Sequence, residues 1–290
     1  MKNQLTQLLH ISCIFVLIGF FSPLYSAQIT VSLPNNAVAN ADYRIGDSNK
    51  PAVFLLHGFM ATHNLNIIQI MAEELESQGY TIIAPTLSLN INNRHSGANC
   101  DAVHTHTMQS DVDEIAWWVN WIKKKGHKKI IMVGFSTGSL QIAIFLAQNS
   151  PAIIKKAVLI SPAYLAGDPF PKAEEKADID TAKKLLANDV NQLHEYHLSY
   201  CKGDFVAPPN VFLSYKKWTE MQMINVVKNI TTPYSVIIGG ADHRFGTRLV
   251  KHIGLKNSKV ITIPGANHFF DSPYEFDFLD QLILELVLRK

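Results

Sequence analysis

The 290-residue sequence has almost no excess of either charge, because 26 lysines and arginines stand against 24 aspartates and glutamates. A nearly neutral chain lacks the strongly basic face with which nucleic-acid-binding domains hold phosphates, so no nucleic acid is expected as a partner. The one basic cluster, residues 123–129, lies at the expected end of a helix. Lysines in that position complement the helix dipole and face water.

The sequence also offers little that could span a membrane. The apolar run Ile11–Phe21 near the N-terminus is too short to cross a bilayer comfortably. It follows Lys2 and precedes a segment that ends in Ser26 and Ala27, which is the layout of a secretory signal peptide. We therefore expect residues 1–27 to be a cleaved leader and the protein to be exported, to a periplasm or out of the cell. An uncleaved N-terminal membrane anchor is the alternative.

Cysteine is scarce, with three in the whole chain. Removal of the leader would take away Cys13 and leave Cys100 and Cys201, an even pair in an oxidising compartment. We predict a disulfide between them, which would tie the polar loop around Arg94–Cys100 to the end of an inserted helical segment. Two separate free thiols are the alternative.

The most informative segment that is present is Gly134–Gly138, which has the pattern Gly-x-Ser-x-Gly. It follows the apolar run Ile130–Val133 and precedes Leu140–Gln148, which has helical character. This pattern between a strand and a helix is typical of a nucleophile elbow, a sharp turn that exposes the serine hydroxyl. Ser136 is therefore the candidate nucleophile. A Gly/Ser-rich turn without chemistry is the alternative interpretation.

A serine nucleophile needs a base that removes its proton and an acid that orients the base. Downstream of the elbow, Asp242 follows one expected strand and His268 follows the next. Reactive groups of open α/β sheets gather at the carboxyl ends of the strands, so Ser136, Asp242 and His268 should meet there. Asp271 is the reserve candidate for the acid, because it also lies near the histidine.

Acyl-transfer chemistry also builds negative charge on a carbonyl oxygen, and backbone N–H groups aimed at that oxygen stabilise it. The apolar strand Ala52–Leu56 leads into His57–Phe59, where a glycine allows close approach to the nucleophile. The expected oxyanion-hole donors are the N–H groups of Phe59 and of Thr137, the residue after the nucleophile. His57 is expected to fix this loop by hydrogen bonding, not to act as the base.

These motifs together resemble those of α/β-hydrolase-fold serine hydrolases of the esterase and lipase kind, over nearly all of the chain after the leader. The matching segments are His57–Phe59, Gly134–Gly138, Gly240–Asp242 and Gly265–His268. The resemblance implies an α/β fold with a mostly parallel central sheet flanked by helices. Pro85–Leu89 lacks the Asp-x-x-Gly-His-Gly pattern of the monoglyceride-lipase-like branch, so no subfamily is assigned.

The alternation of strands and helices lapses after the expected strand Lys156–Ser161. Helical periodicity extends from Lys172 to Tyr200. In the fold that the chain resembles, an insertion after the sixth strand forms a helical cap over the active site. We expect such a cap at residues 162–232, within a single hydrolase domain of residues 28–290. Its aromatic side chains would either line an apolar acyl pocket or attach the cap to the core: Tyr164, Tyr196, Tyr200, Phe205, Phe212, Tyr215 and Trp218.

The polar loop between residues 86 and 106 contains several histidines. His104 and His106 form a His-x-His pair that could offer two metal ligands. The sequence shows no matching second cluster, and Cys100 has a better use in a disulfide, so no metal site is expected. A histidine of this loop is expected to contact substrate or polar groups of the cap instead.

The sequence thus predicts an exported serine hydrolase that cleaves a small-molecule carboxylic ester or thioester through an acyl-enzyme on Ser136. No cofactor is required. The substrate could also be a lipid ester or an ester located at a membrane surface. Two other functions stay open. The same residues could transfer the acyl group to an alcohol, or the chain could bind ligands without catalysis on a hydrolase scaffold.

Overall fold

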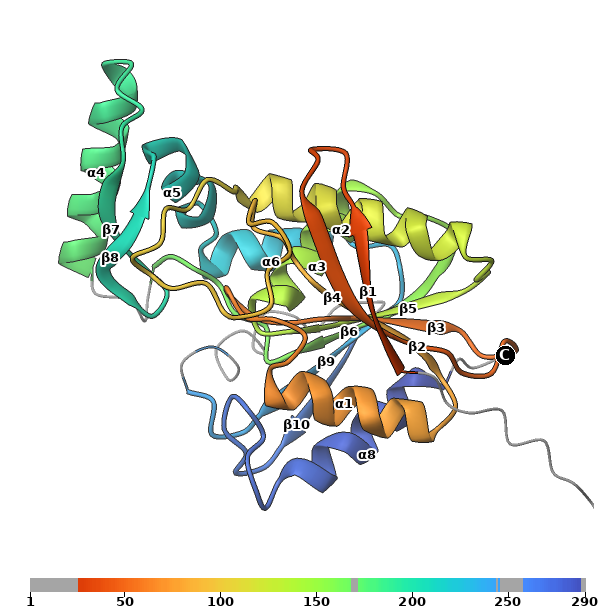
Figure 1. Ribbon diagram of the computed structural model, residues 1–290. Coiled ribbons are helices and arrows are strands. Elements are labelled where there is room, and N and C mark those ends of the chain that lie inside the picture. The colour runs from red at the N-terminus through yellow and green to blue at the C-terminus, as the bar shows by residue number, and fades with distance from the viewer. Residues whose placement is uncertain (1–25, 168–171, 244, 246–257, 288–290) are drawn as a thin grey trace, which may run out of the picture.

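The computed structural model describes residues 26–167, 172–243, 245 and 258–287 (Figure 1). Eight strands form one sheet in the order β1-β2-β4-β3-β5-β6-β9-β10. Strand β2 pairs antiparallel with β1 and β4, and every later pair is parallel. This is the mostly parallel sheet that the sequence predicted. The strands are β1 (Ser26–Ser32), β2 (Val38–Arg44), β3 (Ala52–Leu56), β4 (Thr81–Thr86), β5 (Ile130–Phe135), β6 (Ile154–Ile160), β9 (Tyr234–Gly239) and β10 (Ser258–Ile263).

Helices cover both faces of the sheet, so the central strands β3, β4, β5 and β9 are buried along their whole length. Helices α1 (Asn66–Ser77) and α8 (Glu275–Leu286) lie on one face (Figure 1). Helices α2 (Met108–Lys124), α3 (Thr137–Gln148) and α6 (Glu220–Lys228) lie on the other. Two hydrophobic clusters result, one on each side of the sheet. The apolar runs of the sequence are therefore strands buried on both faces.

Between β6 and β9 the chain leaves the sheet and forms the cap, which projects beyond the sheet in Figure 1. The cap contains helix α4 (Lys172–Ala187), a hairpin of β7 (His194–Leu198) and β8 (Cys201–Ala207), and helix α5 (Pro209–Lys216). The insertion follows the sixth strand, as predicted.

The helical structure that the periodicity from Lys172 to Tyr200 predicted is present in the first half of this segment and wrong for the second half. Helix α4 ends at Ala187, and the chain turns at Asp189, whose φ is 55°. In β7 the side chains of Tyr196 and Leu198 face inward, because the strand pairs with β8. The pairing of β7 with β8 outweighs the local helical periodicity of this segment.

A disulfide joins Cys100 and Cys201, with an S–S distance of 2.03 Å. The predicted bridge is therefore confirmed, and it connects the loop before α2 to the first residue of β8. Two backbone bonds reinforce this connection. The N–H of His104 donates to the carbonyl of Val206 at 2.8 Å, and the N–H of Val206 donates to the carbonyl of Cys100 at 3.3 Å. The hairpin of the cap is thus held by the loop that precedes α2.

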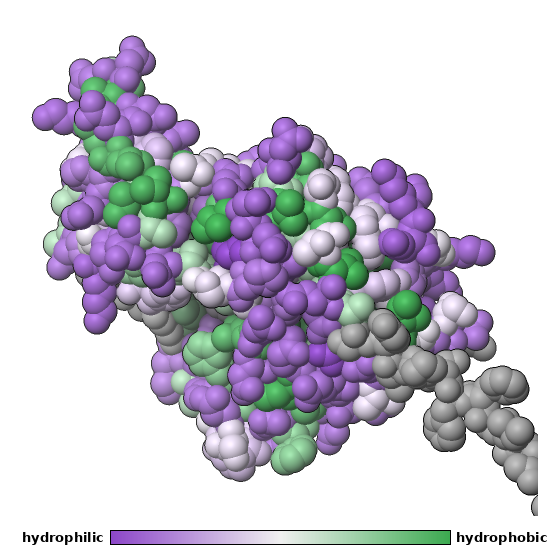
Figure 2. All heavy atoms as spheres, viewed as in Figure 1, coloured by the Kyte–Doolittle hydropathy of each residue, from purple (hydrophilic) through white to green (hydrophobic). Residues whose placement is uncertain are grey.

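The visible surface is mostly hydrophilic, and its hydrophobic side chains form separate small groups, one of them on the cap (Figure 2). Scattered exposed hydrophobic residues are normal on a protein surface. Within the described residues no helix is long and apolar enough to cross a membrane. Residues 1–25 of the expected leader lie outside the described residues, and Ser26 and Ala27 begin β1.

Candidate active site

Ser136 lies in the sharp turn between β5 and α3, with φ 56° and ψ −122°. A positive φ is strained for a residue with a side chain, and such strain is typical of a nucleophile elbow. The flanking glycines leave room for the backbone to turn this sharply. A Cβ on Gly138 would lie 2.3 Å from the carbonyl oxygen of His57, and a Cβ on Gly134 would lie 2.8 Å from backbone atoms of Gly138. No larger residue fits at either position.

The loops after β9 and β10 bring an acid and a histidine to the serine. The Nε2 atom of His268 lies 3.0 Å from the Oγ atom of Ser136, and its Nδ1 atom lies 2.7 Å from Oδ2 of Asp242. The side chain of Asp242 is 2% exposed, whereas that of His268 is 19% exposed and can meet a substrate. Three residues from three strand ends therefore form one continuous hydrogen-bonded series.

Asp271, the reserve candidate for the acid, takes no part in this series. Its side chain is exposed, and its Oδ2 atom accepts a hydrogen bond of 2.8 Å from Nδ2 of Asn267. The structure therefore places Asp242, and not Asp271, at the histidine. Asp271 instead contacts Asn267 in the same loop as the histidine.

The loop after β3 lies directly beside the nucleophile. A Cβ on Gly58 would lie 3.2 Å from the Cβ of Ser136, a contact tighter than most Cβ atoms make, so glycine favours this close approach. Phe59 and Thr137, the expected oxyanion-hole residues, line the same cavity as Ser136. Thr137 is the first residue of α3, and the first N–H groups of a helix have no partner within the helix.

His57 fixes this loop, as the sequence predicted. Its Nε2 atom accepts the N–H of Leu87 at 3.1 Å, so its Nδ1–H group donates to the carbonyl of Gly58 at 2.8 Å. Burial, with a smaller contribution from the charge of Arg94, lowers the pKa of His57 to about 3. The imidazole is therefore neutral at physiological pH and joins the loops after β3 and β4.

The buried Arg94 also organises these loops, and nothing in the sequence singled it out. Its guanidinium donates to the carbonyls of Met60 at 3.1 Å, Ala61 at 2.8 Å, Ser96 at 2.9 Å and Leu87 at 2.7 Å. Burial lowers the pKa of Arg94 to about 10, so the group keeps its charge at neutral pH. One side chain thus satisfies carbonyls of the loop after β3, of the loop after β4 and of its own segment.

Replacing Arg94 by methionine is expected to destabilise the protein and to lower its kcat. The loss leaves buried carbonyls without donors, each of which costs about 1–3 kcal/mol of the free energy of unfolding. Arg94→Lys should be nearly as harmful, because one ammonium group cannot reproduce the planar fork of a guanidinium. Urea denaturation measures the effect. A free energy of unfolding of Arg94→Lys equal to that of the wild type would contradict the role of the planar guanidinium.

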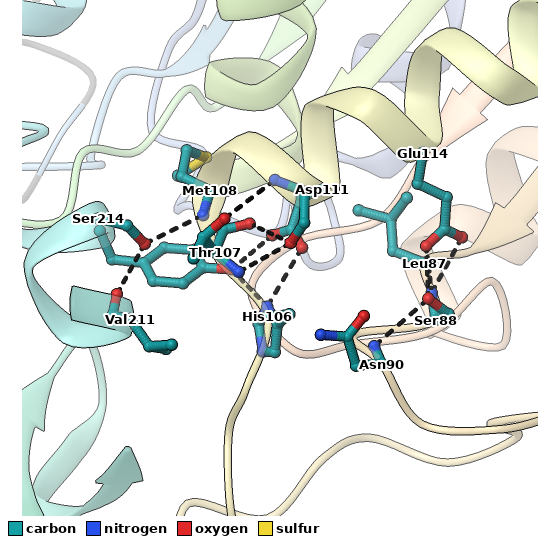
Figure 3. Close-up of polar contacts among 12 residues, drawn as sticks. Leu87, Ser88, Asn90, His106, Thr107, Met108, Asp111, Glu114, Val211 and Ser214 are labelled. Atoms are coloured by element: carbon teal, nitrogen blue, oxygen red, sulfur yellow. Dashed lines mark hydrogen bonds and ion pairs between the residues drawn. The ribbon is translucent and has the colours of Figure 1, made fainter. Parts of the chain in front are cut away.

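Glu114 holds the loop after β4 from the side of α2, as Figure 3 shows. Both of its carboxyl oxygens lie 3.0 Å from the N–H of Ser88, and the Ser88 hydroxyl donates to Oε2 at 2.6 Å. Burial, with a smaller contribution from the nearby charge of Asp111, raises the pKa of Glu114 to about 7, against the hydrogen bonds from Ser88, which lower it. The folded protein therefore favours the protonated carboxyl.

Glu114 should make stability fall as the pH rises. Its folded pKa lies above the unfolded value, so its stabilising contribution is complete below about pH 4.5 and is lost as the pH approaches about 7. The loss is at most about 3 kcal/mol, and less to the extent that water reaches the half-buried side chain. We expect the free energy of unfolding of Glu114→Gln to depend less on pH over this range than that of the wild type. Equal pH dependence would contradict the raised pKa.

The two histidines of the loop before α2 face the cap and the core. His104 stacks on Phe205 of the cap at 4.2 Å, with its Nε2 atom 3.1 Å from the carbonyl of Asn99. His106 lies with its Nδ1 atom 3.2 Å from Oδ1 of Asp111. The same Nδ1 atom lies 2.5 Å from the hydroxyl of Tyr215 in the cap, so the expectation that a histidine of this loop contacts a polar group of the cap is confirmed.

A cavity of about 560 Å³ opens at the nucleophile. No lysine or arginine is among the described residues that line it. Of the seven aromatic residues singled out in the cap, Tyr164 and Tyr200 line this cavity and the other five do not. The aromatic side chains of its wall are Phe59, Phe135, Tyr164, Tyr200, Phe245 and Phe269.

Comparison with known proteins agrees with the fold that the sheet order and the turn at Ser136 indicate. The family model described as the alpha/beta hydrolase fold matches residues 51–270. The chain belongs to the α/β-hydrolase family. A search of curated proteins finds no sequence match for this hydrolase.

Solved structures of other α/β hydrolases share its fold at low sequence identity. Est1E from Butyrivibrio proteoclasticus is 20% identical, with a TM-score of 0.63 over 90% of this chain and 99% of that one. The α/β hydrolase GrgF from Penicillium sp. sh18 is 13% identical, with a TM-score of 0.68 over 90% and 96% of the two chains. The Pyrococcus furiosus esterase Pf2001 is 16% identical, with a TM-score of 0.58 over 89% of each chain. Identities this low support the fold alone.

Proposed function

We propose that this α/β hydrolase is an exported serine hydrolase that cleaves a carboxylic ester or thioester through an acyl-enzyme. The observation that carries the proposal is the series of short contacts from Ser136 through His268 to Asp242, with distances of 3.0 and 2.7 Å. A carboxylate on Nδ1 selects the tautomer whose Nε2 atom can accept the serine proton.

In the proposed reaction, Oγ of Ser136 attacks the carbonyl carbon while Nε2 of His268 takes the hydroxyl proton. The N–H groups of Phe59 and Thr137 stabilise the resulting oxyanion, and Asp242 stabilises the imidazolium. The imidazolium then gives its proton to the leaving alcohol or thiol, which leaves an acyl group on Ser136. Water, activated by the same histidine, hydrolyses this acyl-enzyme and restores the serine.

The cavity wall supports an apolar acyl group. Its aromatic rings offer apolar contact area for such a group. Est1E, which shares the fold, has been solved with ferulic acid bound. An aromatic acyl ester therefore belongs in any substrate panel, next to short and long aliphatic esters.

Export is supported by the disulfide between Cys100 and Cys201 together with the leader-like N-terminal sequence. Disulfides persist in oxidising compartments and are rare in the cytosol of most organisms. Cell fractionation with N-terminal sequencing tests this part. A mature chain that begins near residue 28 is the expected result, and a cytosolic full-length chain would overturn export.

The enzymatic proposal is tested with p-nitrophenyl esters of increasing acyl length and an aromatic acyl ester, for wild type and His268→Ala. Turnover by the wild type that falls at least about 10³-fold in the variant supports the triad. Added alcohol distinguishes hydrolysis from acyl transfer, because a transferase would form the new ester faster than the free acid. No turnover of any ester by well-folded wild type would favour a binding protein instead.

A further inference from the structure

The ring of Phe59, whose N–H is a proposed oxyanion donor, packs against aromatic rings of the cap. Tyr200 lies 5.5 Å from it between ring centroids, Tyr215 lies 6.2 Å away, and Phe205 lies 6.4 Å away. The rings of Tyr200 and Tyr215 meet Phe59 edge to face, at 76° and 79°. Such pairs contribute beyond the apolar area that they bury. The position of the cap therefore bears directly on the position of the oxyanion loop.

Tyr215 is itself fixed by polar contacts with the core. Its hydroxyl is buried, donates to Oδ2 of Asp111 at 2.6 Å and lies 2.5 Å from Nδ1 of His106. Because the tyrosine proton goes to Asp111, the Nδ1–H group of His106 donates to the tyrosine oxygen. Figure 3 shows His106 and Asp111 facing each other at the start of α2. Burial, and then the carboxylate, raise the pKa of Tyr215 well above its usual range, so it remains a donor.

The same carboxylate reaches the helix that follows the nucleophile. Nε2 of Gln141 in α3 donates to Oδ2 of Asp111 at 2.9 Å. A second contact lies alongside, where the N–H of Met108 donates to Oγ of Ser214 at 3.1 Å (Figure 3). Helix α5 of the cap is thus fastened both to α2 and, through Asp111, to α3.

We propose that Tyr215 is a positioning residue for the reaction: its hydroxyl fastens α5 to the core, and its ring then holds Phe59 so that the N–H of Phe59 faces the oxyanion. This inference rests on the proposed hydrolase function. Tyr215 is not among the described residues that line the catalytic cavity, so it acts through Phe59 and not by touching substrate. A donor that is slightly misplaced weakens the transition state more than the bound substrate.

The direct test is Tyr215→Phe, which keeps the ring and removes the hydroxyl. Tyr196→Phe is the matched control, because Tyr196 is also fully buried in the cap and its hydroxyl has no hydrogen-bond partner within the described chain. We expect Tyr215→Phe to lower kcat for p-nitrophenyl acetate about 10-fold or more while KM changes less than about twofold. Tyr196→Phe should leave both constants within about twofold of wild type. Unchanged kcat in Tyr215→Phe, or equal losses in the two variants, would overturn the positioning role.

A double-mutant cycle shows whether the effect passes through Phe59. Phe59→Ala keeps the backbone N–H and removes the ring, so Tyr215→Phe should have almost no further effect on kcat in that background. If the double variant instead loses kcat by the product of the two single-variant losses, Tyr215 does not act through Phe59. All assays are made well below the unfolding midpoint of each variant. A wild type that neither hydrolyses esters nor reacts with a fluorophosphonate overturns the hydrolase function itself, whereas an active wild type with an insensitive Tyr215→Phe overturns the positioning role alone.

Discussion

Replacing Ser136 by alanine is expected to lower kcat for ester hydrolysis by about 10⁴–10⁶-fold, because it removes the hydroxyl that would carry the acyl group. The effect should appear in kcat and leave substrate binding largely intact, since the apolar wall of the cavity is unchanged. The fold should also persist. Alanine has no larger steric demand than serine at this strained position, where φ is 56°. Stopped-flow or steady-state assays with p-nitrophenyl esters measure the loss.

The residual rate of Ser136→Ala is informative as well. Removing the nucleophile of a comparable triad leaves catalysis above the water reaction, which arises from the oxyanion hole and substrate binding. Activity of Ser136→Ala within about tenfold of wild type would contradict the proposed nucleophile.

Replacing Asp242 by asparagine is the second large effect, and we expect kcat to fall about 10⁴-fold. An asparagine amide can stabilise the wrong tautomer of His268, in which Nε2 carries a proton and cannot accept the one from serine. The loss of the buried carboxylate also removes the charge that stabilises the imidazolium. The pH profile of kcat/KM together with kcat measures this effect.

Asp271→Asn is the matched control for Asp242→Asn. Asp271 is exposed and bonds to Asn267, not to His268, so its conversion to an amide should change kcat by less than about threefold. A large loss in Asp271→Asn with a small one in Asp242→Asn would exchange the roles of the two acids.

The sequence predicted the sheet and the convergence of Ser136, Asp242 and His268 because those features depend on local patterns. Apolar runs mark the buried strands, and reactive residues directly after those runs must meet at the carboxyl edge of a parallel sheet. The glycines around Ser136 were informative for a related reason. They lie where backbone segments pass within 2.3 and 2.8 Å of a Cβ position, and such contacts exclude every other residue.

The cap was predicted only in outline. Its place in the chain follows from the lapse in alternation, but the hairpin of β7 and β8 depends on pairing between two segments and on the disulfide at Cys201. Residues 194–198 carry no strong local signal for a strand. Tertiary contacts settled their conformation against a helical pattern.

The polar contacts of Arg94 and Tyr215 escaped prediction because they span long sequence distances. Tyr215 and Asp111 are 104 residues apart, and Arg94 reaches Met60 across 34 residues. Nothing in a single sequence specifies such pairs. The one available signal was a polar loop longer than compact domains usually contain, which typically marks functional segments.

The central claim is that Ser136 is an activated nucleophile. The most direct measurement is mass-spectrometric mapping of the adduct that a fluorophosphonate forms with the mature, folded protein, with Ser136→Ala and His268→Ala treated in parallel. We expect one stoichiometric adduct on Ser136 in the wild type, no adduct in Ser136→Ala and strongly slowed labelling in His268→Ala. An adduct on another residue, or none on folded wild type under conditions that label a known serine esterase, would contradict the account.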